Sequence, residues 1–397
     1  MTFAVPQSFQ GWVSISRIGN LPLVAAAVLC AVVVLLVRAP DAFTNPQMWA
    51  EDATVFWIQQ YQYGWAAVVM PYAGYLHLAV RLTAGLASLF DPAYAPTIYV
   101  GASAFFAAWS AATAATVTVK PIVKFLFAAT LTLPPHPTGE IFGNLANVQW
   151  LMAPTLVLVL ATDPPASRFW RLNQSAFVLV SGLSGPFSIF LLPLSVWRIV
   201  RNIDGPSVLA TVSGTLQLAT LAMSLSQMFP QPGESAPLHL IVMMLGRCVH
   251  MSPWAAAAGL AVLFASLTIS EGRWVRLCLL YLASAIIISA ALKFRQDSYA
   301  FDSPEDGPRY FYIPQLVIVW CAISLCFSRR AGIIVGIAAL VTLALTYPHE
   351  FFKRPQLPDE LWAEHVKNIG KMLVVIPVNP PGWSVTVPEP ESIWSTH

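Results

Sequence analysis

Apolar stretches long enough to form helices recur from Leu21 to Tyr347, and short polar loops separate most of them. This pattern constrains the fold most, because the chain is 57% hydrophobic and 10% charged, whereas a soluble domain carries roughly 25% charged residues. We predict an all-α polytopic membrane protein with about eleven transmembrane helices. The expected spans are 21–38, 95–116, 122–134, 148–162, 174–184, 186–199, 206–228, 253–269, 275–292, 311–327 and 331–347.

Basic residues recur in alternate short loops, and the positive-inside tendency predicts that these loops face the cytoplasm. They are Arg17, Lys120, Lys124, Arg168, Arg171, Arg198, Arg201, Arg273, Arg276, Arg329 and Arg330. An odd number of spans then places the N-terminus in the cytoplasm and the C-terminus in the periplasm. We expect a multi-pass protein of the bacterial inner (plasma) membrane. The segments expected on the outer side are 39–94, 135–147, 229–252, 293–310 and 348–397.

Two parts are predicted from this arrangement. Residues 1–347 form a transmembrane module, and its first external loop, 39–94, carries two interfacial helices. One of these covers 74–90 and lies on the outer surface. Residues 348–397 are polar and rich in proline, and they form a small external C-terminal cap with a strand and a turn between Met372 and Trp383.

Two adjacent carboxylates, Glu51 and Asp52, follow the first span in a chain where acids are rare. We predict a helix from Pro46, which would place Trp49, Ala53, Phe56 and Trp57 on one face suited to lipid. Glu51 would then point away from this aromatic face, and Asp52 would lie at its border. The alternative interpretation is that both acids are residues of an early helical turn, favoured by the helix dipole.

Polar side chains also gather between apolar spans in the loop 135–150, where burial near a membrane is costly and marks function. They are His136, Glu140, Asn144, Asn147 and Gln149. Their carboxyl and amide groups suit sugar hydroxyls, while helix capping and loop solvation are the alternative. Tyr75 lies in the first external loop. His77 lies near it, and a lone histidine is more often a surface or packing residue than a functional one.

Arg309 precedes Tyr310 and Tyr312 at the start of an apolar span. A guanidinium group followed by aromatic rings suits a lipid phosphate, and Lys293 or Arg295 can assist. Arg247 and His250 are weaker phosphate candidates. The alternative is that Arg and Tyr anchor the helix end at the membrane interface.

The remaining sequence patterns concern nucleotide, nucleic-acid and metal sites. The sequence contains no nucleotide-binding fingerprint and no P-loop, and the net charge of +2 predicts no nucleic-acid partner. The five cysteines form no C-x-x-C pair, so no zinc site is predicted. No cofactor is predicted with certainty, although Glu51, Asp52 and Glu140 leave a divalent cation open.

Five segments together resemble the GT-C superfamily of polytopic membrane glycosyltransferases, and most of all the bacterial members that modify O-antigen, lipopolysaccharide and other cell-envelope glycans. They are WAED (49–52), PYAGYLH (71–77), GEIFGNLANVQW (139–150), GPRYFYIP (307–314) and IPVNPPGW (376–383). The resemblance implies a GT-C-like fold and a polyprenyl-phosphate-linked sugar as donor. It also implies that Asp52 is the catalytic base, with Glu51 as its partner or alternate. The chain lacks the large soluble C-terminal domain of bigger members.

The expected reaction is inverting transfer of the sugar to a hydroxyl of a glycan or glycolipid on the outer face of the membrane. We expect Asp52 to act without a raised pKa, because an ionised carboxylate suffices as a base. The donor phosphate is assigned to Arg309, Lys293, Arg247 and Tyr310, and the sugar or acceptor to Tyr75, His77, Glu140, Asn144 and Asn147.

Three other classes stay open. A transporter or flippase of lipid-linked sugars would use similar polar groups, but the internal repeat typical of transporters is not visible. A membrane O-acyltransferase would need a catalytic histidine, and His77, His136 and His250 lack a partnering motif. A non-catalytic scaffold is the third class, and the long external loops argue against it.

Overall fold

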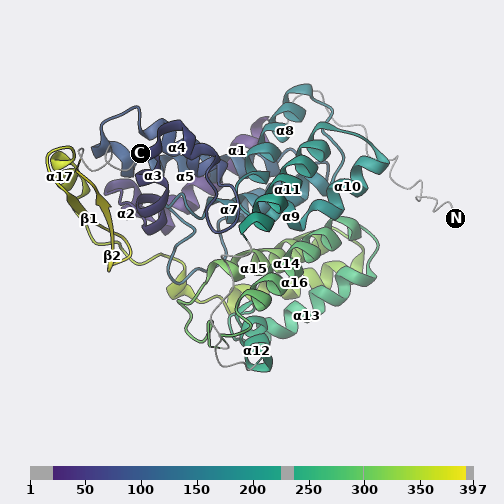
Figure 1. Ribbon diagram of the computed structural model, residues 1–397. Coiled ribbons are helices and arrows are strands. Elements are labelled where there is room, and N and C mark those ends of the chain that lie inside the picture. Colours follow the sequence, from purple (N-terminus) through teal and green to yellow (C-terminus); the bar gives the residue numbers. More distant parts are fainter. Residues whose placement is uncertain (1–20, 225–236, 298, 390–397) are drawn as a thin grey trace.

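The computed structural model describes residues 21–224, 237–297 and 299–389 (Figure 1). The protein is mostly helical, at 68%, which confirms the predicted helical class. Arg17, residues 229–236 of an expected loop and residues 390–397 of the tail lie outside the described residues.

Within the described ranges the chain forms seventeen α-helices, and every predicted span coincides with at least one of them. Span 186–199 is divided between two helices, Phe187–Phe190 and Leu192–Arg201. The first eight helices are α1 (Leu21–Arg38), α2 (Pro40–Thr44), α3 (Ile58–Tyr63), α4 (Leu78–Ala87), α5 (Ala95–Ala114), α6 (Pro121–Thr130), α7 (Val148–Ala161) and α8 (Arg168–Gly182). The others are α9 (Phe187–Phe190), α10 (Leu192–Arg201), α11 (Gly205–Ser224), α12 (Pro237–Arg247), α13 (Pro253–Thr268), α14 (Arg273–Lys293), α15 (Arg309–Cys326), α16 (Arg330–Leu345) and α17 (Trp362–His365).

Four helices of the described residues, α1, α11, α14 and α15, are long and apolar enough to cross a membrane by length and composition. The apolar helices α4, α6, α7, α12, α13 and α16 are shorter. The number of eleven crossings and the orientation in the membrane therefore stay predictions.

Helix α7 forms the centre of the fold. All of its residues are buried, as expected for a helix that is apolar on every side. It contacts α5 and α8 on one side and α14 and α15 on the other. Figure 1 accordingly shows α12–α16 as one group of helices and α1–α11 as another, with α7 where the two groups meet.

The two ends of α7 lead to different surroundings. At its C-terminal end, Thr118 Oγ1 donates to the Asp163 carbonyl at 2.7 Å, and Arg198 Nη1 donates to the Thr162 carbonyl at 2.7 Å. The loops predicted to be cytoplasmic thus meet there. The N-terminal end, about 21 Å away at 1.5 Å per residue, adjoins the acidic first external loop.

The first external loop differs from its prediction in two ways. The helical segment begins at Ala50 rather than Pro46, and Asp52–Trp57 (η2) is wound as a π-helix before α3 begins. The aromatic stripe does not lie on lipid: Phe56 and Ala53 have no exposed surface, and Trp49 and Trp57 are also buried. The prediction of a lipid-facing stripe is wrong because other parts of the chain cover this face.

The segment predicted to lie on the surface, 74–90, contains the ten-residue helix α4. It packs against η2, α5 and α8. Arg81 on α4 is fully buried, donates to Gln59 Oε1 at 2.6 Å and lies over the Phe56 ring at 4.9 Å. One side of α4 therefore belongs to the protein core, while Leu82 and Leu86 remain exposed.

The tail folds as predicted, with a strand followed by a turn. Strands β1 (Val374–Val378) and β2 (Trp383–Val387) form an antiparallel hairpin, which Figure 1 shows beside α17 at the edge of the molecule. The hairpin covers part of the buried aromatic stripe: β2 contacts η2, and the Asn379 amide donates to the Met48 carbonyl at 3.0 Å. A buried ion pair between Arg354 and Asp41, at 2.6 Å, fixes the start of the tail.

Candidate functional site

The two adjacent acids have different environments because they lie on a helical turn. Asp52 is 1% exposed, and its Oδ2 atom accepts a hydrogen bond from the Leu145 amide at 3.0 Å. Its Oδ1 atom is buried and has no partner among the described residues. Glu51, one residue earlier, is only partly buried. A π-helical turn is rare and is frequent at functional sites.

Burial and, to a smaller extent, the negative charge of Glu51 raise the pKa of Asp52 to about 8, against the opposing effect of the Leu145 and Ala146 amides. The expectation that Asp52 acts without a raised pKa is therefore wrong. The sequence predicts Asp52 at the border of the aromatic face, as an ionised carboxylate, but the loop 139–147 packs over it. A pKa near the working pH suits a group that exchanges a proton.

Arg309 and Glu140 form the second part of the site. Arg309 Nη1 lies 2.9 Å from Glu140 Oε2, and the Arg309 backbone amide donates to Glu140 Oε1 at 3.1 Å. The Arg309 side chain keeps 30% of its surface exposed. Burial raises the pKa of Glu140, and Arg309 opposes this by favouring the carboxylate. This pair joins the loop 135–147 to the start of α15.

Glu51 connects the two parts electrostatically. Its charge contributes to raising the pKa values of Asp52, Tyr72 and Glu140, and it also acts on Arg309. Arg309 therefore lies near two carboxyl groups, Glu140 and Glu51, and Glu51 in turn acts on Asp52, the most deeply buried of the three acids. We call Glu51, Asp52, Glu140 and Arg309 the carboxylate–arginine site.

Aromatic side chains border this site. Burial raises the pKa of Tyr75, with Tyr310 and Arg309 close enough to contribute. Tyr310 packs edge-on against Trp150, with 5.4 Å between ring centroids, and its hydroxyl accepts a hydrogen bond from Lys293 Nζ at 2.9 Å. Lys293 therefore contacts Tyr310, and the assignment of both residues to a donor phosphate stays a prediction.

The polar loop 139–147 is held by its own side chains. Asn147 Nδ2 donates to the Glu140 carbonyl at 3.1 Å, and Asn144 Nδ2 donates to the same oxygen. Both amide groups are buried. They fix the loop that supplies the Leu145 amide to Asp52, so their observed contacts position the site rather than present donors to a sugar.

Arg247 and His77, two other predicted site residues, already make contacts within the protein. Arg247 donates to four backbone carbonyls of the segment 301–306, with distances of 2.7 to 3.2 Å, and so fixes that loop. His77 is buried between Phe56, Tyr72 and Tyr75, and burial lowers its pKa to about 4. Their assignments to a phosphate and a sugar stay predictions without a supporting contact.

The sequence did not indicate Tyr72, Arg81 or Tyr99 as site residues. The Tyr99 hydroxyl, Asp52 Oδ1 and two nitrogen atoms of Arg81 are buried without hydrogen-bond partners among the described residues. Tyr99 interacts electrostatically with both Asp52 and Arg81. The spacing of these residues along the chain carries no signal for their approach.

The sequence left open whether Glu51, Asp52 and Glu140 bind a divalent cation. Within the described ranges, no group of three His, Cys, Asp or Glu side chains is arranged to hold a metal ion. The chemistry that the site offers directly is proton exchange at Asp52 and stabilisation of negative charge at Arg309.

All five segments that carry the resemblance meet around this site. Segment 49–52 contacts 139–150 through Asp52 and Leu145, and 139–150 contacts 307–314 through Glu140 and Arg309. Segment 71–77 approaches 307–314 at Tyr75 and Tyr310, and 376–383 pairs with Trp49. Comparison of the chain with protein-family models, curated proteins and solved structures gives no match.

Proposed function

We propose that the protein is a GT-C-like glycosyltransferase, which moves a sugar from a polyprenyl-phosphate donor to a hydroxyl of a cell-surface glycan or glycolipid. The proposed setting is the outer face of the bacterial inner membrane. The observation that carries the proposal is that a buried carboxyl group, Asp52, and a partly exposed arginine, Arg309, bind the same loop, 140–145, from segments more than 250 residues apart in the chain.

In the proposed reaction Asp52 is the base. Its Oδ1 atom, which has no hydrogen-bond partner in the described part of the chain, takes the proton of the acceptor hydroxyl, while the Leu145 amide holds Oδ2. The acceptor oxygen attacks the anomeric carbon, and the bond from that carbon to the phosphate oxygen breaks, with inversion. Polyprenyl phosphate leaves with the electron pair of that bond.

Arg309 is proposed to stabilise the leaving phosphate. The guanidinium carbon of Arg309 lies 5.6 Å from the centroid of the Tyr310 ring. Lys293 adds a second positive charge through its hydrogen bond to Tyr310. A guanidinium group and an ammonium group together match the charge that develops on a departing phosphate.

A transfer assay with purified full-length protein in lipid nanodiscs tests the proposal. The probes are polyprenyl-phosphate hexoses with lipid extracts as acceptor, and the release of free polyprenyl phosphate is measured. Asp52→Asn should reduce the rate by about 10²- to 10⁴-fold, because one base contributes this much. The wild-type rate should rise with pH and reach a plateau above about pH 8, since Asp52 must be ionised.

Two matched variants make the test specific. Arg309→Ala should slow phosphate release, whereas Arg273→Ala, at an exposed position at the start of α14, should leave the rate unchanged. The assignment of the base is wrong if Asp52→Asn retains the wild-type rate. Unchanged rates in Asp52→Asn, Glu51→Gln and Arg309→Ala together would exclude a glycosyltransferase site here and favour transport of the lipid-linked sugar.

A further inference from the structure

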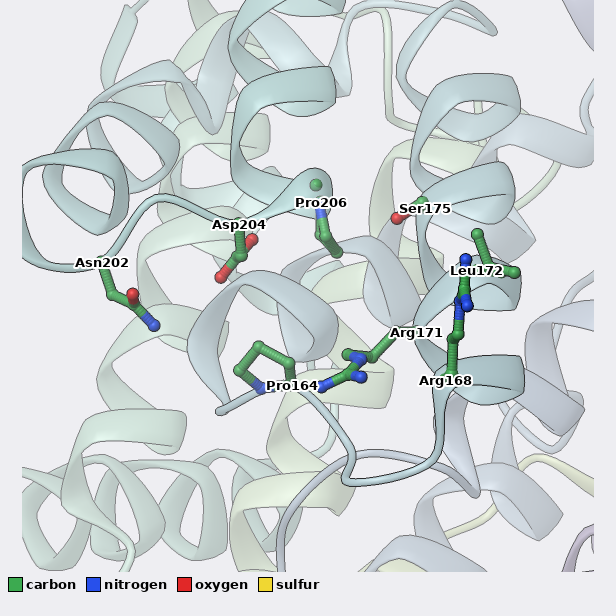
Figure 2. Close-up of a pocket in the computed structure, with 9 residues that line it drawn as sticks. Pro164, Arg168, Arg171, Leu172, Ser175, Asn202, Asp204 and Pro206 are labelled. Atoms are coloured by element: carbon green, nitrogen blue, oxygen red, sulfur yellow. The ribbon is translucent and has the colours of Figure 1, made fainter.

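A separate cavity of about 430 Å³ lies at the opposite end of the helices, where the basic loops meet. Figure 2 shows it between the first turns of α8 and the segment that leads into α11. Arg168, Arg171 and Ser175 line it from α8, and Asn202 lines it from the other side. None of these residues belongs to the carboxylate–arginine site.

The cavity carries a positive charge that the chain does not neutralise locally. Arg168 and Arg171 are exposed at its wall. Asp204, which also lines the cavity, already has a hydrogen-bond partner at each carboxylate oxygen. Its Oδ2 atom accepts from Arg198 Nε at 2.7 Å, and its Oδ1 atom accepts from the Ser207 amide at 2.9 Å. Asp204 therefore does little to offset the two arginines of α8.

The backbone adds to this positive potential. Helix α8 begins at the cavity, and its N-cap residue, Ser167, makes no side-chain hydrogen bond to the first turn. The amides of a first turn and the helix dipole favour an anion. The arginines and the helix N-terminus thus act in the same direction on a ligand in this cavity.

Apolar groups make up the rest of the cavity and its surroundings. Pro164, Leu172 and Pro206 line the wall. Next to them, Phe169 on α8 is 67% exposed and Ile203 before α11 is 74% exposed. A free phosphate ion gains nothing from such a surface, whereas a lipid places its phosphate at the arginines and its chains along the apolar side chains.

We propose that this cavity is a binding site for the phosphate head group of an anionic membrane lipid, held by Arg168 and Arg171. Ser175 and Asn202 supply additional hydrogen bonds to the head group. The proposal is independent of the reaction at the carboxylate–arginine site, because the two sites lie at opposite ends of α7.

Native mass spectrometry of the full-length protein tests this directly, with phosphatidylglycerol, diacylglycerol and inorganic phosphate as probes. The wild-type protein should retain phosphatidylglycerol and neither of the other two. Arg168→Gln combined with Arg171→Gln should weaken phosphatidylglycerol binding by at least about tenfold, because charge-assisted hydrogen bonds are lost. Each single change should weaken it measurably, which keeps the test valid if the double variant folds poorly.

The matched control is Arg329→Gln combined with Arg330→Gln, an exposed basic pair at the start of α16 that does not line this cavity. It should leave phosphatidylglycerol binding unchanged. An equal loss in both double variants would mean that general surface charge attracts the lipid, and the site would be rejected. Equal retention of diacylglycerol, or binding of inorganic phosphate alone, would also overturn the proposal.

Discussion

The titration of Asp52 gives a direct test of its environment that requires no substrate. The folded protein raises its pKa from 3.8 to about 8, so the folded state favours the protonated carboxyl group. For a raised pKa, the contribution to stability is complete below the unfolded value of 3.8 and is lost as the pH rises through the folded value of about 8. Stability should therefore fall across this window.

The magnitude follows from the two pKa values. One pKa unit corresponds to about 1.4 kcal/mol. Between pH 5 and pH 9, the unfolded chain keeps Asp52 ionised almost throughout, while the folded chain resists ionisation until about pH 8. Integrating the difference gives a loss of about 4 kcal/mol in the free energy of unfolding over this range.

The perturbation is Asp52→Asn, because the amide is isosteric and its oxygen can still accept the Leu145 hydrogen bond. Thermal unfolding in nanodiscs is followed from pH 5 to pH 9. The wild-type melting temperature should fall by several degrees more than that of Asp52→Asn. Glu305→Gln, an exposed acid on another loop, should keep the wild-type slope. If Asp52→Asn also keeps that slope, Asp52 is not the buried, protonated group described above.

Three further predictions concern the framework around the site, each measured by thermal or denaturant unfolding. Arg354→Met leaves the buried carboxylate of Asp41 without its partner and should cost about 3–5 kcal/mol; an unchanged stability would contradict a buried pair. Trp320→Ala removes a fully buried ring stacked on Phe127 and should cost about 3–5 kcal/mol. Gly85→Ala places a Cβ 2.6 Å from the Trp65 ring and should cost about 1–3 kcal/mol; a neutral effect would show that Trp65 moves freely.

The helices could be predicted from the sequence, because apolar stretches between basic loops carry the signal directly. The number of membrane crossings did not follow, since a short apolar helix such as α7 is buried in protein as readily as in lipid. Composition alone does not distinguish these two surroundings.

Individual residues of the candidate site could be predicted from the sequence, but their contacts could not. Glu51, Asp52, Glu140 and Arg309 stood out because charged groups are rare in this chain, but their contacts depend on long-range packing. The burial of Asp52 depends on the loop 139–147, and the burial of the aromatic stripe depends on the C-terminal hairpin. Neither covering segment is visible from the local pattern, so the pKa of Asp52 was predicted wrongly.

The charge balance links the raised pKa of Asp52 to the rest of the site. Arg309 is paired with Glu140, while Glu51 adds its negative charge beside Asp52. An ionised Asp52 would therefore place a second negative charge next to Glu51, at a buried position. Proton uptake from an acceptor hydroxyl therefore restores the more stable form of the folded protein, so the same burial that weakens the protein at high pH favours the step proposed for Asp52.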